Sequence, residues 1–153
     1  MQTGMMRLRE LTLRYSVKKT LDGTAVAIGR VLSRPSDAAA ALMTILQDEP
    51  AEVFGILCLS TKHHVIGYHE VSRGTIDSTL VDPRETFTAA LLARAAAIIA
   101  VHVHPSGDPT PSVDDRELTR RLAAAGTLLG VSLLDHIIIG DNRYFSFNEG
   151  GLL

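Results

Sequence analysis

The sequence predicts an α/β protein in which helices sandwich a mixed β-sheet, and three observations support this fold class. Short apolar runs typical of strands alternate along the chain with longer segments typical of helices. The run from Ala95 to Val101 is almost entirely apolar, as expected for a buried strand. The chain has 153 residues, of which 46% are hydrophobic, so it can bury one core but not two. We therefore expect one folded domain without internal repeats.

Helix starts and turns can be located in the first half of the chain. Pro35-Ser36-Asp37 is a helix-opening pattern, and a stretch rich in Ala and Leu follows it. Two apolar runs on either side of the segment 61–64 predict a β-hairpin. The expected elements are an extended segment over 12–31 with one or two strands, a helix over 35–47, and strands over 53–59 and 65–72.

The second half continues the alternation of helices and strands. Pro83 suits the first turn of a helix, Ser112 suits an N-cap, and Gly130 suits the residue after a helix end. Asp141-Asn142 predicts the turn between the last two strands. The expected elements are helices over 83–96 and 113–129, and strands over 98–103, 131–139 and 143–147.

Charge is distributed unevenly along the chain, whose formal net charge is −2. Residues 1–34 carry seven basic and two acidic side chains, a net charge of +5, so the remainder carries −7. We divide the chain into a basic N-terminal arm, residues 1–29, packed on a domain over residues 30–153. We expect this basic segment to be solvated or paired with the acidic body, and residues 1–34 to make at most weak, non-specific contact with DNA.

Cysteine content and apolar stretches predict where the protein resides. Cys58 is the only cysteine, so it cannot form an internal disulfide, and we expect it to be buried as a small apolar residue. The N-terminus has no apolar segment typical of a signal peptide. The longest apolar stretch, Thr88 to Val101, is short for a membrane span and contains Arg94. We expect a cytoplasmic protein with no membrane contact; its oligomeric state is not predicted.

Two histidines close the predicted central strand. His102 and His104 are two residues apart, so on a strand their side chains share one face while Val103 points to the other. A proline-rich loop then leads to Ser112 and Asp115 at a helix start. If the loop folds back over the strand end, Asp115 can join the two histidines. Two His and one carboxylate form a common catalytic zinc set, with the fourth position left to water.

The segment from Ser112 to Asp115 also has a plainer interpretation. It matches a capping box, in which the N-cap side chain and the side chain three residues later bond each other's backbone N–H groups. A capping box by itself does not account for the two histidines upstream. We therefore favour a metal site at this position.

A zinc hydrolase also needs a general base beside the bound water. Glu52 stands at the start of the predicted strand over 53–59, where an acidic side chain is awkward unless it faces a polar site. Most glutamates at a strand start are simply solvated. The residues alone leave both interpretations of Glu52 open.

A second polar pair lies inside a predicted apolar strand. We expect Asp135 and His136 to form a buried hydrogen-bonded pair. A role in supporting the metal ligands is the alternative.

The spacing His-x-His, seven residues, Ser, two residues, Asp resembles the metal-binding signature of JAB/MPN metalloproteases, whereas Asp108 and Asp114 do not fit that spacing. Other segments are similar to the RadC branch of this superfamily, and the resemblance covers roughly residues 30–150. Those segments are 74–78, 83–85, 104–112 and 134–140.

This resemblance implies a JAB/MPN, cytidine-deaminase-like architecture and a zinc-dependent hydrolase that cleaves a peptide or isopeptide bond. It implies His102, His104 and Asp115 as the Zn²⁺ ligands. It also implies Glu52 as the general base and Ser112 as a hydrogen-bond donor to the developing oxyanion. The expected partner is a peptide or protein substrate.

Two departures from the family pattern are visible. Val103 stands where relatives usually carry Asn, Ser or Thr between the histidines, so we expect a local hydrogen bond to be lost and the metal ion to be retained. Longer RadC proteins carry an N-terminal helix-hairpin-helix region, and we expect this chain to be a short, single-domain relative without it.

Two other function classes also use a bound metal. One is a DNA-repair-associated accessory or DNA-binding protein with a structural metal, although no residue is identified that reads DNA bases. The other is a zinc deaminase, which needs a pair of metal-binding cysteines or its equivalent. A chain whose only cysteine is Cys58 argues against deamination.

Overall fold

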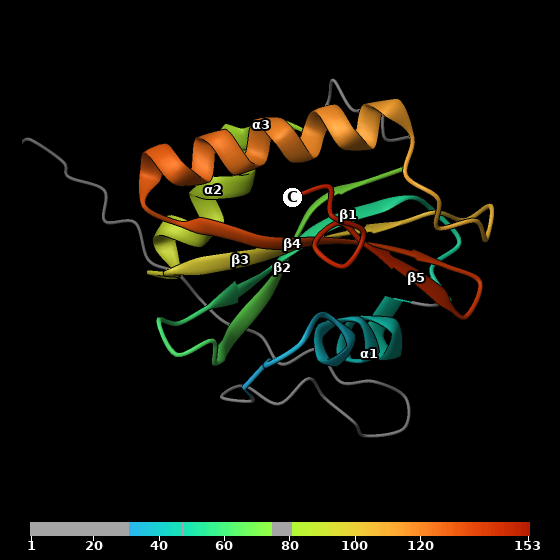
Figure 1. Ribbon diagram of the computed structural model, residues 1–153, viewed down its shortest axis with the longest axis horizontal. Coiled ribbons are helices and arrows are strands. Elements are labelled where there is room, and N and C mark those ends of the chain that lie inside the picture. The colour runs from blue at the N-terminus through green and yellow to red at the C-terminus, as the bar shows by residue number, and fades with distance from the viewer. Residues whose placement is uncertain (1–30, 47, 75–80) are drawn as a thin grey trace, which may run out of the picture.

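The computed structural model describes residues 31–46, 48–74 and 81–153, and it forms a five-stranded mixed sheet with helices on both faces (Figure 1). The predicted α/β sandwich is therefore confirmed. The extended segment predicted over 12–31 lies outside the described residues except for Val31, which forms an isolated bridge with His64. The elements are α1 (Pro35–Leu46), β1 (Val53–Leu59), β2 (Val65–Arg73), α2 (Pro83–Leu92), β3 (Ala97–Val103), α3 (Val113–Leu129), β4 (Ser132–Gly140) and β5 (Arg143–Ser146).

The sheet has the strand order β2-β1-β3-β4-β5. Only β3 and β4 run parallel, and the other neighbours are antiparallel. Because β1 is antiparallel to β3, with Val53 opposite Val103, the start of β1 lies at the same edge as the ends of β3 and β4. Polar residues at these three strand ends can therefore meet.

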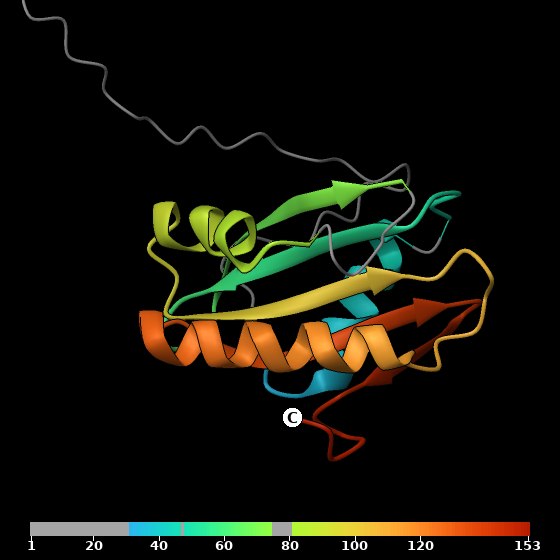
Figure 2. The ribbon, with the colours of Figure 1, turned by 90° about the horizontal axis from the view of Figure 1, so that it is seen from above.

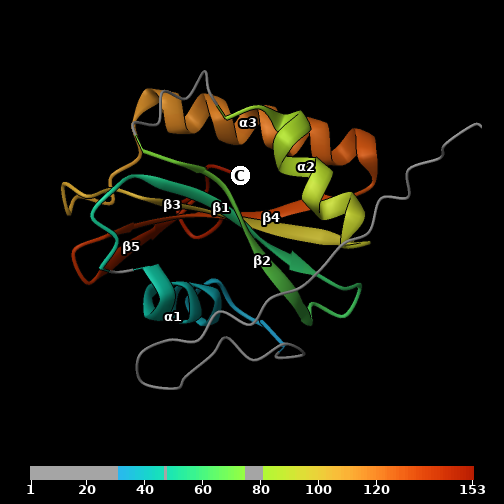
Figure 3. The same cartoon turned by 180° about the vertical axis from the view of Figure 1, so that it is seen from behind.

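Apolar side chains alternate between two cores on opposite faces of the sheet. On one face, Leu42 and Leu46 of α1 belong to the same buried cluster as Leu57 of β1. On the other face, Phe87 of α2 and Leu118 of α3 belong to a second cluster. The view from behind shows the same arrangement, with α1 on one side of the sheet and α2 and α3 on the other (Figure 3).

Helices α2 and α3 share one face of the sheet but cover different strands. Seen from above, α3 lies lengthwise over the β3–β4 side, and α2 lies toward β1 and β2 (Figure 2). In β3, Ile98 and Ala100 point to this face, whereas Ile99 and Val101 point to α1. The same alternation directs His102 toward α3.

Helix α2 is shorter than predicted: it ends at Leu92, whereas we expected it to end at about Ala96. Arg94 has a left-handed backbone conformation (φ 52°), and the Ala95 N–H bonds back to the helix at 2.9 Å. The Ala96 N–H is already bonded to the Leu59 oxygen at 2.9 Å. These residues favour a helix locally, but pairing of β3 with β1 overrides that preference.

Two glycines allow the loop after β3 to fold back over the strand ends. Gly107 has a positive φ of 84°, and its oxygen accepts a hydrogen bond from the Asp141 N–H at 2.9 Å. A Cβ atom at Gly140 would clash with that same carbonyl oxygen. The close approach of this loop to β4 brings the start of α3 over the end of β3, next to the histidines. As predicted, Gly130 ends α3 in the left-handed conformation (φ 71°).

None of the helices in the described parts of the chain is both long and apolar enough to cross a membrane.

Candidate metal centre

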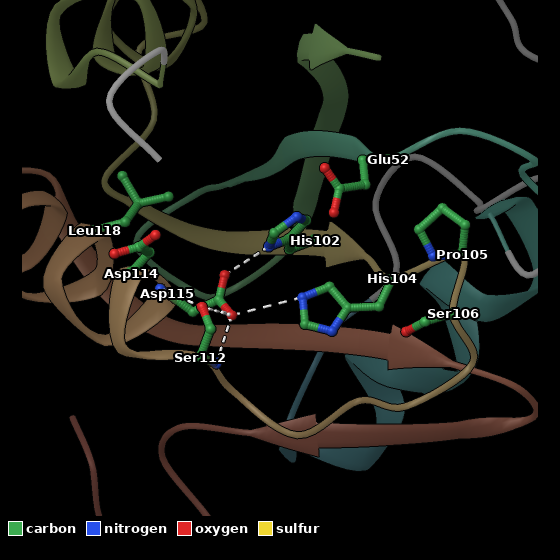
Figure 4. A pocket seen from close by; sticks show the side chains of 9 residues that line it. All are labelled: Glu52, His102, His104, Pro105, Ser106, Ser112, Asp114, Asp115 and Leu118. Carbon is green, nitrogen blue, oxygen red and sulfur yellow. Dashed lines mark hydrogen bonds and ion pairs between the residues drawn. The ribbon is translucent and has the colours of Figure 1, made fainter. Parts of the chain in front are cut away.

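His102 and His104 lie at the end of β3, on the side of the sheet that faces α3 (Figure 4). Their ring centroids are 4.7 Å apart, and the His102 residue is only 5% exposed. Val103 between them is buried in the core on the α1 side, so it points away from the two imidazoles. The side-chain directions predicted from strand alternation are therefore confirmed.

Asp115 joins the two histidines from the first turn of α3. Its Oδ1 lies 2.9 Å from His102 Nδ1, and its Oδ2 lies 3.5 Å from His104 Nε2. The capping box is also present, because the Asp115 N–H donates to Ser112 Oγ at 3.0 Å and the Ser112 N–H donates to Asp115 Oδ2 at 2.7 Å. The capping role of this carboxylate is therefore compatible with its contacts to the two histidines.

The three side chains have the geometry of a ligand set. One donor atom from each of His102, His104 and Asp115 lies within 4.8 Å of the others, so the group could hold a metal ion. Tetrahedral zinc with bonds of about 2.1 Å separates neighbouring ligand atoms by about 3.4 Å. The distance from Asp115 Oδ2 to His104 Nε2, 3.5 Å, is close to that value, whereas Asp115 Oδ1 lies 2.9 Å from His102 Nδ1, at hydrogen-bond distance. Among the described residues, Asp108 and Asp114 do not join this group.

A hydrogen bond from the proline-rich loop orients His104. Its Nδ1 lies 2.8 Å from the backbone oxygen of Asp108, which can only accept, so Nδ1 carries the proton. In the neutral imidazole, Nε2 is then unprotonated and faces Asp115, as a metal ligand requires. The Asp108 side chain is held in turn by Thr110, whose N–H and hydroxyl donate to Oδ1 at 3.0 and 2.7 Å.

Electrostatics keep the Asp115 carboxyl ionised. Burial opposes its ionisation, but hydrogen bonds with the two histidines and Ser112 outweigh burial and hold the pKa of Asp115 well below its usual range. When His104 is protonated, its Nε2–H donates to the Asp115 carboxylate, and this raises the pKa of His104 against the opposite effect of burial. An ionised carboxylate at neutral pH is the form that binds a cation.

Glu52 lies in the same pocket as the three candidate ligands. In the β1–β3 pairing, Phe54 is opposite His102, so extending the register places Glu52 beside His104. The charge of Glu52 also contributes to the raised pKa of His104. In Figure 4 the Glu52 carboxylate points toward the space in front of the two imidazoles. The pocket has a volume of about 290 Å³ and is lined by Glu52, His102, His104, Pro105, Ser106, Ser112, Asp114, Asp115 and Leu118.

Ser112, the predicted oxyanion donor, also lines this pocket. Its Oγ donates to Asp115 Oδ2 at 2.7 Å and accepts from the Asp115 N–H. The hydroxyl proton is therefore directed at the carboxylate in this structure. The catalytic roles of Ser112 and Glu52 stay predictions.

Sequence reasoning missed a buried contact behind the ligands. Thr119 Oγ1 lies 2.7 Å from His136 Nδ1, and both residues are almost completely buried. The expected pair of Asp135 and His136 is present only through the His136 backbone N–H, which donates to Asp135 Oδ1 at 2.8 Å. The Asp135 side chain instead accepts from Ser146 Oγ at 2.6 Å. In the sequence, the only sign that His136 makes a buried contact was its position inside an apolar strand.

Comparison with known protein families matches residues 32–152 to the RadC-like JAB domain. The chain belongs to this family. The resemblance inferred from motif spacing is thereby confirmed, and the RadC-like JAB domain includes the whole candidate metal centre.

Similar proteins carry the name UPF0758 protein. One from Desulfitobacterium hafniense is 48% identical over 123 residues, which cover 80% of this chain and 54% of the relative. One from Alkaliphilus metalliredigens is 45% identical over 150 residues, covering 98% of this chain and 65% of the relative. One from Clostridium perfringens is 43% identical over 151 residues, covering 99% and 63%. The chain thus spans between about half and two thirds of the length of these relatives.

Proposed function

We propose that this domain is a zinc-dependent hydrolase that cleaves a peptide or isopeptide bond. The observation that carries the proposal is the meeting, in one pocket, of a three-residue ligand set and a separate carboxylate, that of Glu52. Hydrolysis by a metal-activated water needs both parts. Membership of the RadC-like JAB domain family supports the assignment.

The donor set fits zinc. Two imidazoles and one carboxylate leave the fourth tetrahedral position for water or substrate, and the hydrogen bond to Asp108 turns the free nitrogen of His104 into the site. When bound, zinc would lower the pKa of a coordinated water toward about 7 and polarise the carbonyl to be attacked.

Glu52 is proposed to move the proton. From its place beside His104, its carboxylate would accept a proton from the attacking water and deliver it to the leaving amine. Ser112 is proposed to donate a hydrogen bond to the oxyanion, a role that requires its hydroxyl to turn from Asp115 toward the substrate.

The test is zinc analysis of purified protein combined with cleavage of a panel of peptide and isopeptide substrates. Glu52→Gln keeps the shape of the side chain and removes its basic oxygen, so hydrolysis should fall at least about 10²-fold while zinc content stays unchanged. His104→Ala should lose both zinc and activity. The control is Glu85→Gln, at an exposed glutamate outside the pocket, which should change neither.

Two outcomes would contradict this assignment. Loss of zinc on Glu52→Gln would make Glu52 a metal ligand rather than a base. A zinc-loaded wild type that cleaves nothing on the panel would favour the second candidate, a DNA-associated accessory protein with a structural metal. The net charge of +5 in residues 1–34 favours that candidate, and its DNA binding would weaken steeply as salt rises.

A further inference from the structure

We propose that Thr119 and His136 are positioning residues for the metal centre, which tie the Asp115 turn of α3 to the sheet behind His102. This inference rests on the metal binding in the proposed function. It concerns two buried residues that neither line the pocket nor belong to the ligand set.

The first support is an ordered chain of hydrogen bonds. Thr119 Oγ1 donates to the backbone oxygen of Asp115 at 2.6 Å, which uses the single hydroxyl hydrogen. Oγ1 must therefore act as acceptor toward His136 Nδ1 at 2.7 Å, so Nδ1 carries the imidazole proton. The chain runs from β4, through Thr119, to the residue that supplies the carboxylate.

The second support is that aromatic rings pack around the His136 imidazole and fix its orientation. The imidazole stacks on Phe147 with centroids 4.8 Å apart and an interplanar angle of 11°. It lies parallel to the His102 ring, with centroids 6.3 Å apart. Phe54 packs edge-on against both imidazoles, at 6.2 Å from His102 and 5.8 Å from His136. The donor that holds Thr119 is therefore locked in place next to the first metal ligand.

The third support is that the capping box cannot fix the position of the start of α3 relative to the sheet. The bonds between Ser112 and Asp115 join two residues at one end of α3, so they set the carboxylate relative to its own helix. They do not determine how far that helix end lies from β3. The bond between Thr119 and His136 spans α3 and β4, and β4 is paired with β3 at His102, opposite Ile138. Together with the apolar packing of α3, it therefore fixes the position of the Asp115 turn relative to His102.

Thr86 provides a matched control for a purely structural role. It is fully buried in the first turn of α2, and its Oγ1 donates to the backbone oxygen of Asp82, four residues earlier, at 3.2 Å. Its hydrogen bond is of the same type as that of Thr119 to Asp115. Thr86 is not among the residues that line the pocket. A general cost of removing such a hydroxyl should appear equally in Thr86→Val and Thr119→Val.

The experiment measures zinc affinity by chelator competition, the absorption spectrum of the Co²⁺-loaded protein, and urea unfolding of the metal-free protein. Thr119→Val should lower zinc affinity at least about 10-fold and alter the Co²⁺ spectrum, as expected for losing an outer contact of a metal site. Thr119→Ser, which keeps the hydroxyl, should restore zinc affinity to within about 3-fold of wild type. Thr86→Val should destabilise the metal-free protein without changing zinc affinity or the spectrum.

A measurement on the wild type keeps the proposal testable even if Thr119→Val does not fold. In ¹⁵N NMR spectra of the imidazoles, His136 should be protonated at Nδ1 and not at Nε2. The Nε2-protonated form would overturn the proposal, because Nδ1 could not then donate to Thr119. Wild-type zinc affinity in Thr119→Val, or equal loss in Thr86→Val, would overturn it as well. None of these readouts measures hydrolysis, so failure of the Glu52 test would leave this result standing.

Discussion

Helices α2 and α3 begin in similar ways, but of the two only α3 carries a side chain into the candidate metal centre. In α2, Asp82 caps the helix by accepting from the Arg84 N–H at 2.8 Å, and the first-turn Glu85 is exposed. In α3, Ser112 is the cap, and the first-turn Asp115 is 3% exposed and contacts two histidines. The comparison teaches that the first turn of a helix can contribute to a candidate metal centre where the fold places it over a strand end that carries histidines.

The largest difference between the two helices should appear when the acidic side chain in the first turn of each is replaced. Asp115→Asn keeps the size of the side chain but loses its charge, so zinc affinity should fall by more than about 100-fold. Glu85→Gln should leave zinc affinity unchanged. Chelator competition at constant pH measures both. Equal affinities for wild type and Asp115→Asn would show that Asp115 is only a capping residue.

Beneath α3, buried His136 should make the stability of the protein depend on pH. Burial, followed by the charge of His102, lowers the pKa of His136 under α3 to about 3. The unfolded chain, with an ordinary histidine pKa of about 6.5, binds the proton first, so this contribution to stability is complete above about pH 6.5 and is lost as pH falls toward 3. The loss is about 1.4 kcal/mol per pH unit at most.

Urea unfolding of the metal-free protein between pH 7 and 5 tests this sign. His136→Gln should flatten the decline in unfolding free energy, because the buried imidazole no longer has to stay neutral. His69→Gln, at an exposed histidine on β2, should leave the slope unchanged. A wild-type slope that survives in His136→Gln would assign the pH dependence to other groups.

The smallest expected effects come from the caps themselves. Ser112→Ala and Asp82→Ala should each destabilise the protein by about 1 kcal/mol, because each leaves a helix N–H without its acceptor. Ser112→Ala should also lower zinc affinity about 10-fold, since Ser112 bonds the Asp115 carboxylate directly. Thermal unfolding and chelator competition separate the two effects. A loss of hydrolysis at full zinc occupancy would instead support the oxyanion role of Ser112.

Local sequence patterns predicted the elements well and failed where two segments compete. The Ser112 cap and the Gly130 end of α3 follow from backbone groups within one turn, so they were visible in the sequence. The end of α2 was not, because the helix-favouring residues after Leu92 are taken up by the start of β3. Tertiary pairing with β1 outweighs the small helix propensities of a few alanines.

In the candidate site, too, local sequence patterns predicted some features and strand pairing decided others. The alternation of side chains along a strand sufficed to put His102 and His104 on one face, and their spacing to Ser112 and Asp115 carried the family resemblance. Glu52 precedes His102 by about fifty positions, and only the resemblance singled it out as the base. Its place beside His104 follows from the register of β1 against β3.

The sequence by itself determined which atoms are available: two imidazoles, a capping carboxylate and a loop stiff enough to return over the strand end. Only the tertiary structure decided that the carboxylate reaches the imidazoles and that Thr119 rests on His136. The physical reason is that alternation and capping act over a few residues of one segment. Contact between α3 and β4 depends on how the helix packs on the sheet, which is set by the sum of many weak apolar contacts.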